Sequence, residues 1–416
     1  IDVADDLDSI YASNHAIGRF VSRRAGIGIN MGRVRSYGSE IRKGEATHTG
    51  IIPFLKLAEA ATKSCSQGGL RDGSSTVHFQ IWNKEIEEIL VLKNNKGTDD
   101  NRVRRLDYSI QLSKIFWERM VKGEEITLFS TNDVPGLYDA FGTPAFNDLY
   151  IKYENNHKIP SRKVNGKDLL LSITSERMNT GRIYIQNIDN VNDQTPFKDK
   201  VSMSNLCQEI NLVTNPIYDI NDGLTVNKKI KVKHTDFQIY QDLTQDDSIK
   251  LRPESGMMVF DKTNFVDKKL SKIVSLCSSD EIENPFEFNY LEQEFELMYG
   301  DKPANIALCM LGGVNLGNLN GPETFNRLER PLYYMVKALD KVIDLQDYPV
   351  PASAKQLKTR SIGVGVTNFA YFLAKNNLKY GENDTLEMVD ELFEHIQFYL
   401  MKASMELAKE LGACAY

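Results

Sequence analysis

The sequence predicts a mostly parallel α/β fold, and two observations support this prediction. Short runs rich in β-branched residues alternate along the chain with longer segments whose apolar residues recur at helical spacing. Stretches rich in glycine separate several of these segments and mark the loops between them. Strands that alternate with helices in this way are typical of a mostly parallel α/β architecture.

The first part of the chain supplies most of the expected elements. A helix with loosely spaced apolar residues leads into a short buried strand, and a glycine-rich loop at 64–73 follows the next apolar helix. Further short strands alternate with helical segments. The expected helices are 7–24, 51–62, 85–92 and 108–121, and the expected strands are 26–30, 77–82 and 183–185.

The character of the sequence changes between 222 and 300. Residues 228–240 alternate polar and apolar side chains, and the rest is rich in lysine, aspartate and glutamate without a clear core pattern. We interpret 222–300 as an inserted subdomain of open role between 1–221 and 301–416. In the last part, apolar stripes predict two helices and β-branched residues predict a core strand. These elements are Leu328 to Val342, Leu386 to Leu407 and the strand 362–366.

Composition and charge restrict the class of protein. Hydrophobic residues make up 41% and charged residues 26% of the chain, as in ordinary soluble proteins. The net charge of −7 gives no sign of a general nucleic-acid binder. No apolar run approaches the roughly 20 residues that cross a bilayer. We therefore expect a cytoplasmic protein whose partners are neither membranes nor nucleic acid.

Cysteines and histidines show no metal or disulfide pattern. The chain contains five cysteines, none of them in a Cys-x-x-Cys pair, and the histidines lack metal-ligand spacing. We expect no metal in this chain. The sequence begins with Ile1 rather than methionine and stops at Tyr416 directly after a strongly helical stretch, so we interpret it as a fragment.

The run 205–209, Asn-Leu-Cys-Gln-Glu, carries the main candidate for chemistry. In an extended segment side chains alternate between faces, so Asn205, Cys207 and Glu209 project on one side at a spacing of about 6.5 to 7 Å. A sulfur then lies beside a general base and a neutral hydrogen-bonding group. On the pattern alone, a half-buried strand with a buried thiol is the more common explanation.

The surrounding motifs favour the chemical interpretation, because together they resemble the large catalytic subunit of class I ribonucleotide reductases over nearly the whole chain. Residues 204–210 resemble the finger-loop motif of that family, and Ile306 to Cys309, with 314–317, resembles the segment that holds one of its reducing cysteines. Each match alone is weak, but their joint order is specific. Supporting matches lie at 24–28, 64–69, 134–138, 181–187 and 363–366.

The resemblance implies a fold and a reaction. The fold is a ten-stranded α/β barrel of the ribonucleotide reductase and glycyl-radical type, present here in part, with Cys207 on an internal finger loop. Cys207 becomes a thiyl radical that removes the 3′ hydrogen of a ribonucleoside diphosphate, Glu209 takes the 3′ hydroxyl proton, and Asn205 binds the sugar. Cys309 and a second cysteine, expected upstream of Ile1, supply two electrons by forming a disulfide.

The resemblance also implies an effector site for a deoxynucleoside triphosphate or ATP. Without the resemblance, Asp5 is explained as the cap of the first helix, and Arg35 and Arg42 are explained as solvated surface charge. Arginine nonetheless suits phosphate, because its planar fork donates two hydrogen bonds at once. The site implied by the resemblance comprises Asp5, Asp6, Leu7, Arg35 and Arg42.

Several partners are implied as well. The glycine-rich loop 66–74 resembles the connector that couples the effector site to the catalytic site. A small subunit with a di-metal centre and a tyrosyl radical, a second copy of the large subunit, and thioredoxin or glutaredoxin as reductant are expected. A separate C-terminal half is a further expectation. A cobalamin-dependent reductase and a nucleotide-binding module without catalysis remain the alternatives.

Overall fold

The computed structural model describes residues 1–65, 72–223 and 304–414, together with the backbone of short strands in between. The chain divides into two compact units. Unit 1 comprises Ile1–Ile306 and Pro349–Ser353, and unit 2 comprises Ala307–Tyr348 and Ala354–Tyr416. No helix in the described ranges is long and apolar enough to span a membrane.

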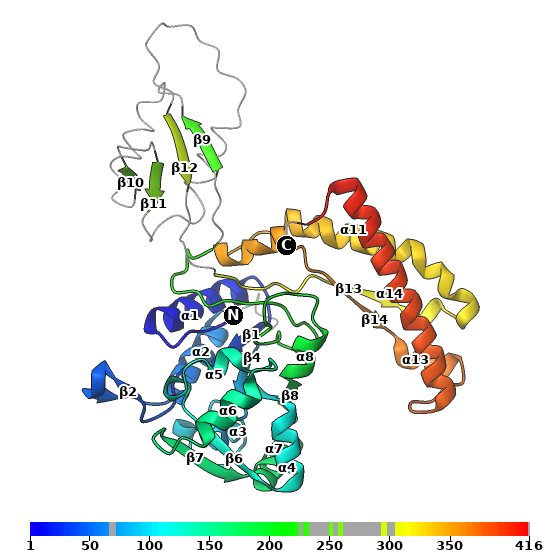
Figure 1. The fold of residues 1–416 in the computed structure, drawn as a ribbon. Helices are drawn as coiled ribbons and strands as arrows, with labels where there is room; N and C mark the ends of the chain where they lie inside the picture. The colour runs from blue at the N-terminus through cyan, green and yellow to red at the C-terminus, as the bar shows by residue number, and fades with distance from the viewer. Residues whose placement is uncertain are drawn as a thin grey trace, which may run out of the picture. The chain divides into compact units, whose positions relative to one another are not determined.

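Unit 1 is built on a four-stranded parallel sheet (Figure 1). Its order is β1 (Ile27–Asn30), β4 (Ser75–Gln80), β5 (Asp107–Leu112) and β8 (Ile183–Asn187), and each pair of neighbours is parallel. Parallel neighbours need crossover connections, and helices lie between the strands in sequence. The predicted parallel α/β architecture is therefore confirmed for this unit.

The two faces of the sheet differ in chemistry. Successive side chains of a strand point to opposite faces, and the register aligns His78, Ser109 and Tyr184 on neighbouring strands. Every position on their face carries a polar side chain or glycine, whereas the opposite face carries mainly aliphatic and aromatic side chains. We call the first surface the polar face. Its polar side chains include Asn30, Thr76, His78, Gln80, Ser109, Gln111, Tyr184 and Gln186.

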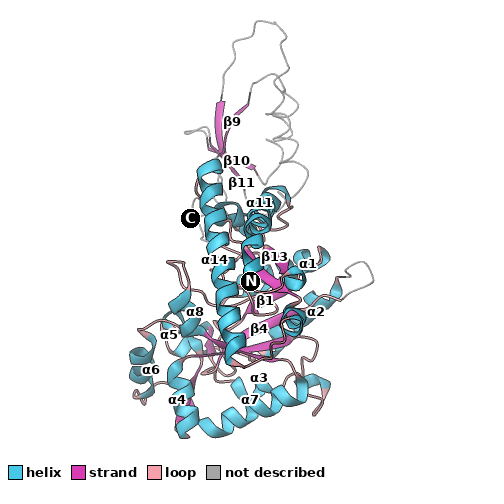
Figure 2. Ribbon diagram, turned by 90° about the vertical axis from the view of Figure 1, so that its right-hand side faces the viewer, coloured by secondary structure: helices cyan, strands magenta, loops and turns pink. Residues whose placement is uncertain are grey.

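The helices of unit 1 have clear start and stop signals. Asp6 caps the first helix by accepting a hydrogen bond from the Asp8 amide at 2.8 Å, and Gly123 and Gly181 end later helices in the left-handed conformation. Figure 2 shows the grouping of α3, α4 and α7, which contact one another through α7. The helices are α1 (Leu7–Ser22), α2 (Ile52–Ser64), α3 (Ile86–Leu90), α4 (Lys114–Lys122), α5 (Leu137–Ala140), α6 (Phe146–Glu154), α7 (Gly166–Thr180) and α8 (Ile188–Gln194).

Shorter pairs of strands complete the described sheets outside unit 2. Strands β2 (Glu40–Ile41) and β3 (Ala46–Thr47) form one antiparallel pair, and β6 (Glu125–Phe129) and β7 (Ser161–Asn165) form another. Antiparallel pairs also join strands within the predicted insertion. These are β9 (Lys228–Val232) with β12 (Gln293–Leu297), and β10 (Ile249–Arg252) with β11 (Met257–Phe260).

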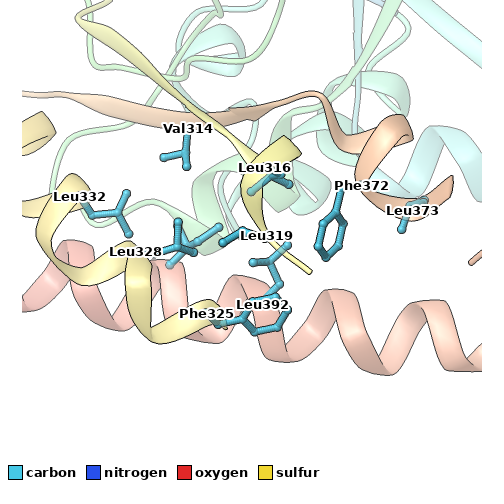
Figure 3. Close-up of a cluster of buried hydrophobic side chains, with 10 residues drawn as sticks. Val314, Leu316, Leu319, Phe325, Leu328, Leu332, Phe372, Leu373 and Leu392 are labelled. Atoms are coloured by element: carbon cyan, nitrogen blue, oxygen red, sulfur yellow. The ribbon is translucent and has the colours of Figure 1, made fainter. Parts of the chain in front are cut away.

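Unit 2 has a core of its own, shown in Figure 3. Strands β13 (Leu311–Asn315) and β14 (Gly363–Thr367) are parallel, and α11 (Glu329–Leu345) packs against α14 (Asn383–Leu411). Shorter helices α12 (Gln356–Thr359) and α13 (Phe369–Lys375) lie on either side of β14 in sequence. The core is formed by Val314, Leu316, Leu319, Phe325, Leu328, Leu332, Phe372, Leu373, Leu392 and Ile396. Both predicted helices of this part are confirmed.

Three predictions need correction. The expected helix 108–121 is two elements, because 107–112 alternates polar and apolar residues and forms β5, and helical structure starts only at Lys114. The expected core strand at 362–366 exists as β14, but among the described residues β13 is its one neighbouring strand, and β14 is partly exposed. Asp6 rather than Asp5 caps the first helix, because the Asp5 carboxylate binds Arg35 instead.

The boundaries of the predicted insertion stay a prediction. Most of 222–300 and residues 66–71 of the glycine-rich loop lie outside the described residues. On either side of the segment, Asn215 and Asn305 form an antiparallel bridge with hydrogen bonds of 3.0 and 3.3 Å. The Asn305 side chain also donates to the Val213 carbonyl at 2.6 Å. The described residues on the two sides of the predicted insertion are therefore held together at this bridge.

Candidate functional site

Residues 202–211 form a turn that we call the Cys207 loop. Its two arms are joined between Asn205 and Ile210: the Ile210 amide donates to Asn205 Oδ1 at 3.1 Å, and the Asn205 amide donates to the Ile210 carbonyl at 3.3 Å. The Ser204 hydroxyl donates to the same carbonyl at 2.7 Å. The backbone bends at 206–208, and Gln208 has a left-handed φ of 68°.

This geometry corrects the prediction of an extended segment. Asn205 and Glu209 lie on opposite arms of a turn with Cys207 in the bend between them, so the strand-like alternation does not apply. The turn still brings the three predicted residues into one loop. Cys207 and Glu209 are exposed, whereas Asn205 is half-buried and uses its side chain oxygen to close the loop.

Side chains of the polar face hold the tip of the Cys207 loop. The Thr76 hydroxyl donates to the Leu206 carbonyl at 2.7 Å, and the Gln208 side chain amide donates to the Ser109 hydroxyl. The residues on each side of Cys207 are therefore fixed to β4 and β5. This arrangement leaves the sulfur at the end of an anchored turn rather than on a freely moving segment.

Glutamines of the polar face hold the base of the loop. Gln111 Nε2 donates to the Ser202 carbonyl at 2.8 Å and to Gln186 Oε1 at 2.9 Å. Gln186 Nε2 in turn donates to Asn211 Oδ1 at 2.8 Å. Both arms of the loop are thus connected to one another through two adjacent strands.

Glycines of β1 and of the residue before it allow the loop to approach this closely. A Cβ atom on Gly28 would lie 2.2 Å from the Ser204 carbonyl oxygen, and one on Gly26 would lie 2.4 Å from Leu206 Cδ2. Real Cβ atoms do not come this near to other heavy atoms, so a larger residue at either position would displace the loop. The glycines at 26 and 28 are therefore explained by the Cys207 loop.

Burial and nearby charge shift the pKa of side chains under the loop. Burial lowers the pKa of His78 to about 3, although the backbones of Ser204 and Asn205 favour its charged form. Burial raises the pKa of Tyr184, and electrostatic interactions with Cys207, Asp107 and Glu209 raise it further. His78 is thus neutral near pH 7, and the Tyr184 phenol lies within electrostatic reach of the two exposed groups.

The predicted effector residues are only partly brought together. Arg35 Nε donates to Asp5 Oδ2 at 2.8 Å, the Arg35 amide donates to Asp5 Oδ1 at 3.0 Å, and Arg35 Nη1 donates to the Glu40 carbonyl at 2.7 Å. Asp6 serves as the helix cap, and Leu7 is 60% exposed. Arg42 is exposed in the turn between β2 and β3.

Cys309 belongs to unit 2, where it is exposed shortly before β13. Cys207 belongs to unit 1. Among the described residues, no group of three or more histidine, cysteine and acidic side chains is arranged to hold a metal ion.

Several residues of the site escaped the sequence analysis, although a signal for them was present. The strands that carry them alternate polar and apolar residues in Thr-Val-His-Phe-Gln (76–80), Tyr-Ser-Ile-Gln (108–111) and Ile-Tyr-Ile-Gln (183–186). A buried parallel sheet is ordinarily apolar on both faces, so regular polar positions indicate a face that meets something polar. The residues missed are Thr76, His78, Ser109, Gln111, Tyr184 and Gln186.

Comparison with known proteins identifies the family. The model for the barrel domain of ribonucleotide reductase matches residues 1–416. The chain is 42% identical to ribonucleoside-diphosphate reductase subunit alpha of Haemophilus influenzae and 40% identical to subunit alpha of reductase 1 of Escherichia coli. The subunit alpha of Enterobacteria phage T4 is 35% identical. In each case all of this chain is covered, but only 45% of the relative. The chain belongs to the ribonucleotide reductase barrel-domain family.

Proposed function

We propose that this chain provides the substrate-reducing part of a ribonucleoside-diphosphate reductase, with Cys207 as the radical-bearing residue. One observation carries the proposal: Cys207 and Glu209 are exposed on a turn whose tip and base are both anchored to the polar face of a parallel sheet. An anchored turn holds a reactive sulfur in a fixed position relative to a bound substrate, as a hydrogen transfer requires. The names of the relatives support the same activity.

The proposed reaction is balanced in atoms and electrons. A radical supplied by a partner subunit takes the hydrogen atom of the Cys207 thiol and leaves a sulfur radical. This radical removes the 3′ hydrogen of the ribose, and Glu209 accepts the 3′ hydroxyl proton. The 2′ hydroxyl leaves as water. Cys309 and a second cysteine supply two electrons and two protons by forming a disulfide, and one of these protons leaves in the water. Glu209 then returns its proton to the 3′ oxygen, Cys207 returns the hydrogen atom to the 3′ carbon, and the radical left on the sulfur passes back to the partner subunit.

A closed barrel around the Cys207 loop is part of the proposed function. We infer that the Cys207 loop is the finger loop of a ten-stranded barrel, and that the four-stranded sheet of unit 1 is part of its wall. A closed interior excludes water from a radical, which protects the intermediates from side reactions. The polar face supports this inference, because an inward face that meets a polar loop needs hydrogen-bonding side chains.

Partners and effectors follow from the same proposal. A small subunit with a di-metal centre would generate the radical, two large subunits would pair, and thioredoxin or glutaredoxin would reduce the disulfide. We further propose an effector site for nucleoside triphosphates that comprises Asp5, Asp6, Leu7, Arg35 and Arg42. The paired Asp5 and Arg35 support this, since the pair fixes a guanidinium near the exposed Arg42 turn.

The test uses the full-length subunit assembled with its radical-generating partner. Cys207→Ser should abolish formation of deoxyribonucleoside diphosphate, because an alcohol does not form the radical that a thiol forms. Cys65→Ser is the matched control, since Cys65 lies in unit 1 at the end of α2 and outside the Cys207 loop. Effector binding by both variants checks that they fold. Reduction by Cys207→Ser at the rate of the control would refute the proposal.

The same assembly distinguishes the main alternative enzyme. A reductase of the proposed class needs the separate metal-containing subunit and is indifferent to adenosylcobalamin. Turnover that requires adenosylcobalamin and no second subunit would contradict the assignment to class I while leaving the role of Cys207 in place.

A further inference from the structure

We propose that Gln111 and Gln186 act as a clamp that positions Cys207 for hydrogen transfer, an inference that rests on the function proposed above. Neither glutamine reaches the bend that carries the sulfur. They act instead on the two arms of the Cys207 loop, at Ser202 and at Asn211. They are therefore positioning residues rather than catalytic ones.

The clamp is continuous across two strands. Gln111 of β5 and Gln186 of β8 are opposite one another in the sheet register. Gln111 donates to the incoming arm at 2.8 Å and to Gln186 at 2.9 Å, and Gln186 donates to the outgoing arm at 2.8 Å. A shift of one arm therefore strains the contact with the other, so the two arms move together or not at all.

Burial makes the clamp stiff. Gln111 is fully buried and Gln186 is 5% exposed, so water does not readily replace a broken hydrogen bond at either side chain. Loss of one donor would leave the Ser202 carbonyl or the Asn211 side chain without its present partner. The loop would then rearrange to find a new one, and the arms carry Cys207 with them.

The clamp differs from a neighbouring glutamine that makes no such contact. Gln80 of β4 is opposite Gln111 in the register and is also fully buried. Its amide donates to the Gly32 carbonyl at 2.9 Å and to Thr131, not to the Cys207 loop. In both Gln80 and Gln111, the side chain oxygen lacks a hydrogen-bond partner among the described residues. Gln80 is therefore a matched control for burial and for chemistry.

The test measures turnover and the kinetic isotope effect with a substrate that carries deuterium at the 3′ carbon. The assembled full-length enzyme is compared with Gln111→Met and Gln186→Met, which keep the side chain length but remove the donors. Misplacing a reacting atom by about 1 Å costs up to roughly 100-fold in rate. We expect kcat to fall about 10- to 100-fold, while KM changes less than about 3-fold.

The isotope effect separates positioning from a general loss of structure. As hydrogen transfer to Cys207 becomes slower than the other steps, the isotope effect on kcat/KM should rise in Gln111→Met and Gln186→Met. It should stay at the wild-type value in Gln80→Met. A second pair sharpens the test: Asn211→Asp keeps an oxygen acceptor for Gln186 and should retain activity, whereas Asn211→Leu should behave like Gln186→Met.

Three outcomes would show that Gln111 and Gln186 do not position Cys207. Wild-type kcat in Gln111→Met, an unchanged isotope effect despite a lower kcat, or an equal loss in Gln80→Met would each refute the clamp. These failures are distinct from failure of the proposed function. If Cys207→Ser is inactive while Gln111→Met is normal, the reduction chemistry stands and only the clamp is wrong.

Discussion

His78 should make the stability of unit 1 fall as the pH is lowered. The ring is fully buried on the polar face, and burial lowers its pKa from 6.5 to about 3. Below pH 6.5 the unfolded chain binds a proton at this ring that the folded chain does not bind. Stability contributed by the neutral ring is therefore lost as the pH falls from 6.5 toward 3.

The expected size follows from this difference in pKa. Between pH 7 and pH 5 the loss is about 2 kcal/mol, and below pH 3 it approaches about 5 kcal/mol. His78→Phe and His78→Gln remove the titrating ring. At pH 7 His78→Phe should also not be strongly destabilising, because it removes two buried ring nitrogens that have no hydrogen-bond partner among the described residues.

Urea unfolding at pH 7 and pH 5 provides the measurement. Both tryptophans, Trp82 and Trp117, lie in unit 1, so their fluorescence reports on the unit that contains His78. The free energy of unfolding should lose about 2 kcal/mol more in the wild type than in either variant. His157→Gln, at an exposed position, is the control. Equal pH dependence in the wild type and both His78 variants would show that the His78 ring does not cause the loss of stability at low pH.

Three further predictions concern the loop and the effector residues. Gly28→Ala should abolish turnover, because its Cβ would lie 2.2 Å from the Ser204 carbonyl oxygen. Gly365→Ala should be tolerated, because a Cβ at Gly365 has no heavy atom within 4 Å. Equal activity of the two variants would contradict this prediction. Gln208→Ala should destabilise the folded chain by about 1 kcal/mol more than Gln208→Gly, because residue 208 has a φ of 68°, and urea unfolding checks the order. Arg35→Ala should raise the Kd for a deoxynucleoside triphosphate at least about 10-fold in equilibrium binding, because a charged hydrogen bond is lost. The control Arg177→Ala should leave this Kd unchanged. Unchanged binding in Arg35→Ala would show that the effector binds elsewhere.

The elements that the sequence predicted best are those with a strong period. Long apolar stripes located α11 and α14, and the β-branched run located β1. The segment 108–121 was misassigned because a strand and a helix follow one another with only Ser113 between them. A window that spans both elements mixes the two periods, so the helical part dominated the interpretation.

For the candidate site, the sequence predicted which residues belong to it better than it predicted their geometry. Motifs located Cys207 and its neighbours, but the expectation of an extended segment, which came from the spacing of the residues, gave the wrong local geometry. The turn depends on hydrogen bonds between Asn205 and Ile210 and on contacts with distant strands. Such long-range contacts leave little local signal. The polar positions of β4, β5 and β8 did carry a signal, yet its meaning depends on knowing that the strands are neighbours in one parallel sheet.

The role of Cys207 in hydrogen transfer can be tested with a crystal structure of the full-length subunit that contains a bound ribonucleoside diphosphate. We expect Cys207 Sγ to lie roughly 3 to 4 Å from the 3′ carbon, within reach for hydrogen transfer, and the Glu209 carboxylate to lie at the 3′ oxygen. A substrate bound away from the Cys207 loop, or a sulfur directed into packed hydrocarbon, would contradict this expectation.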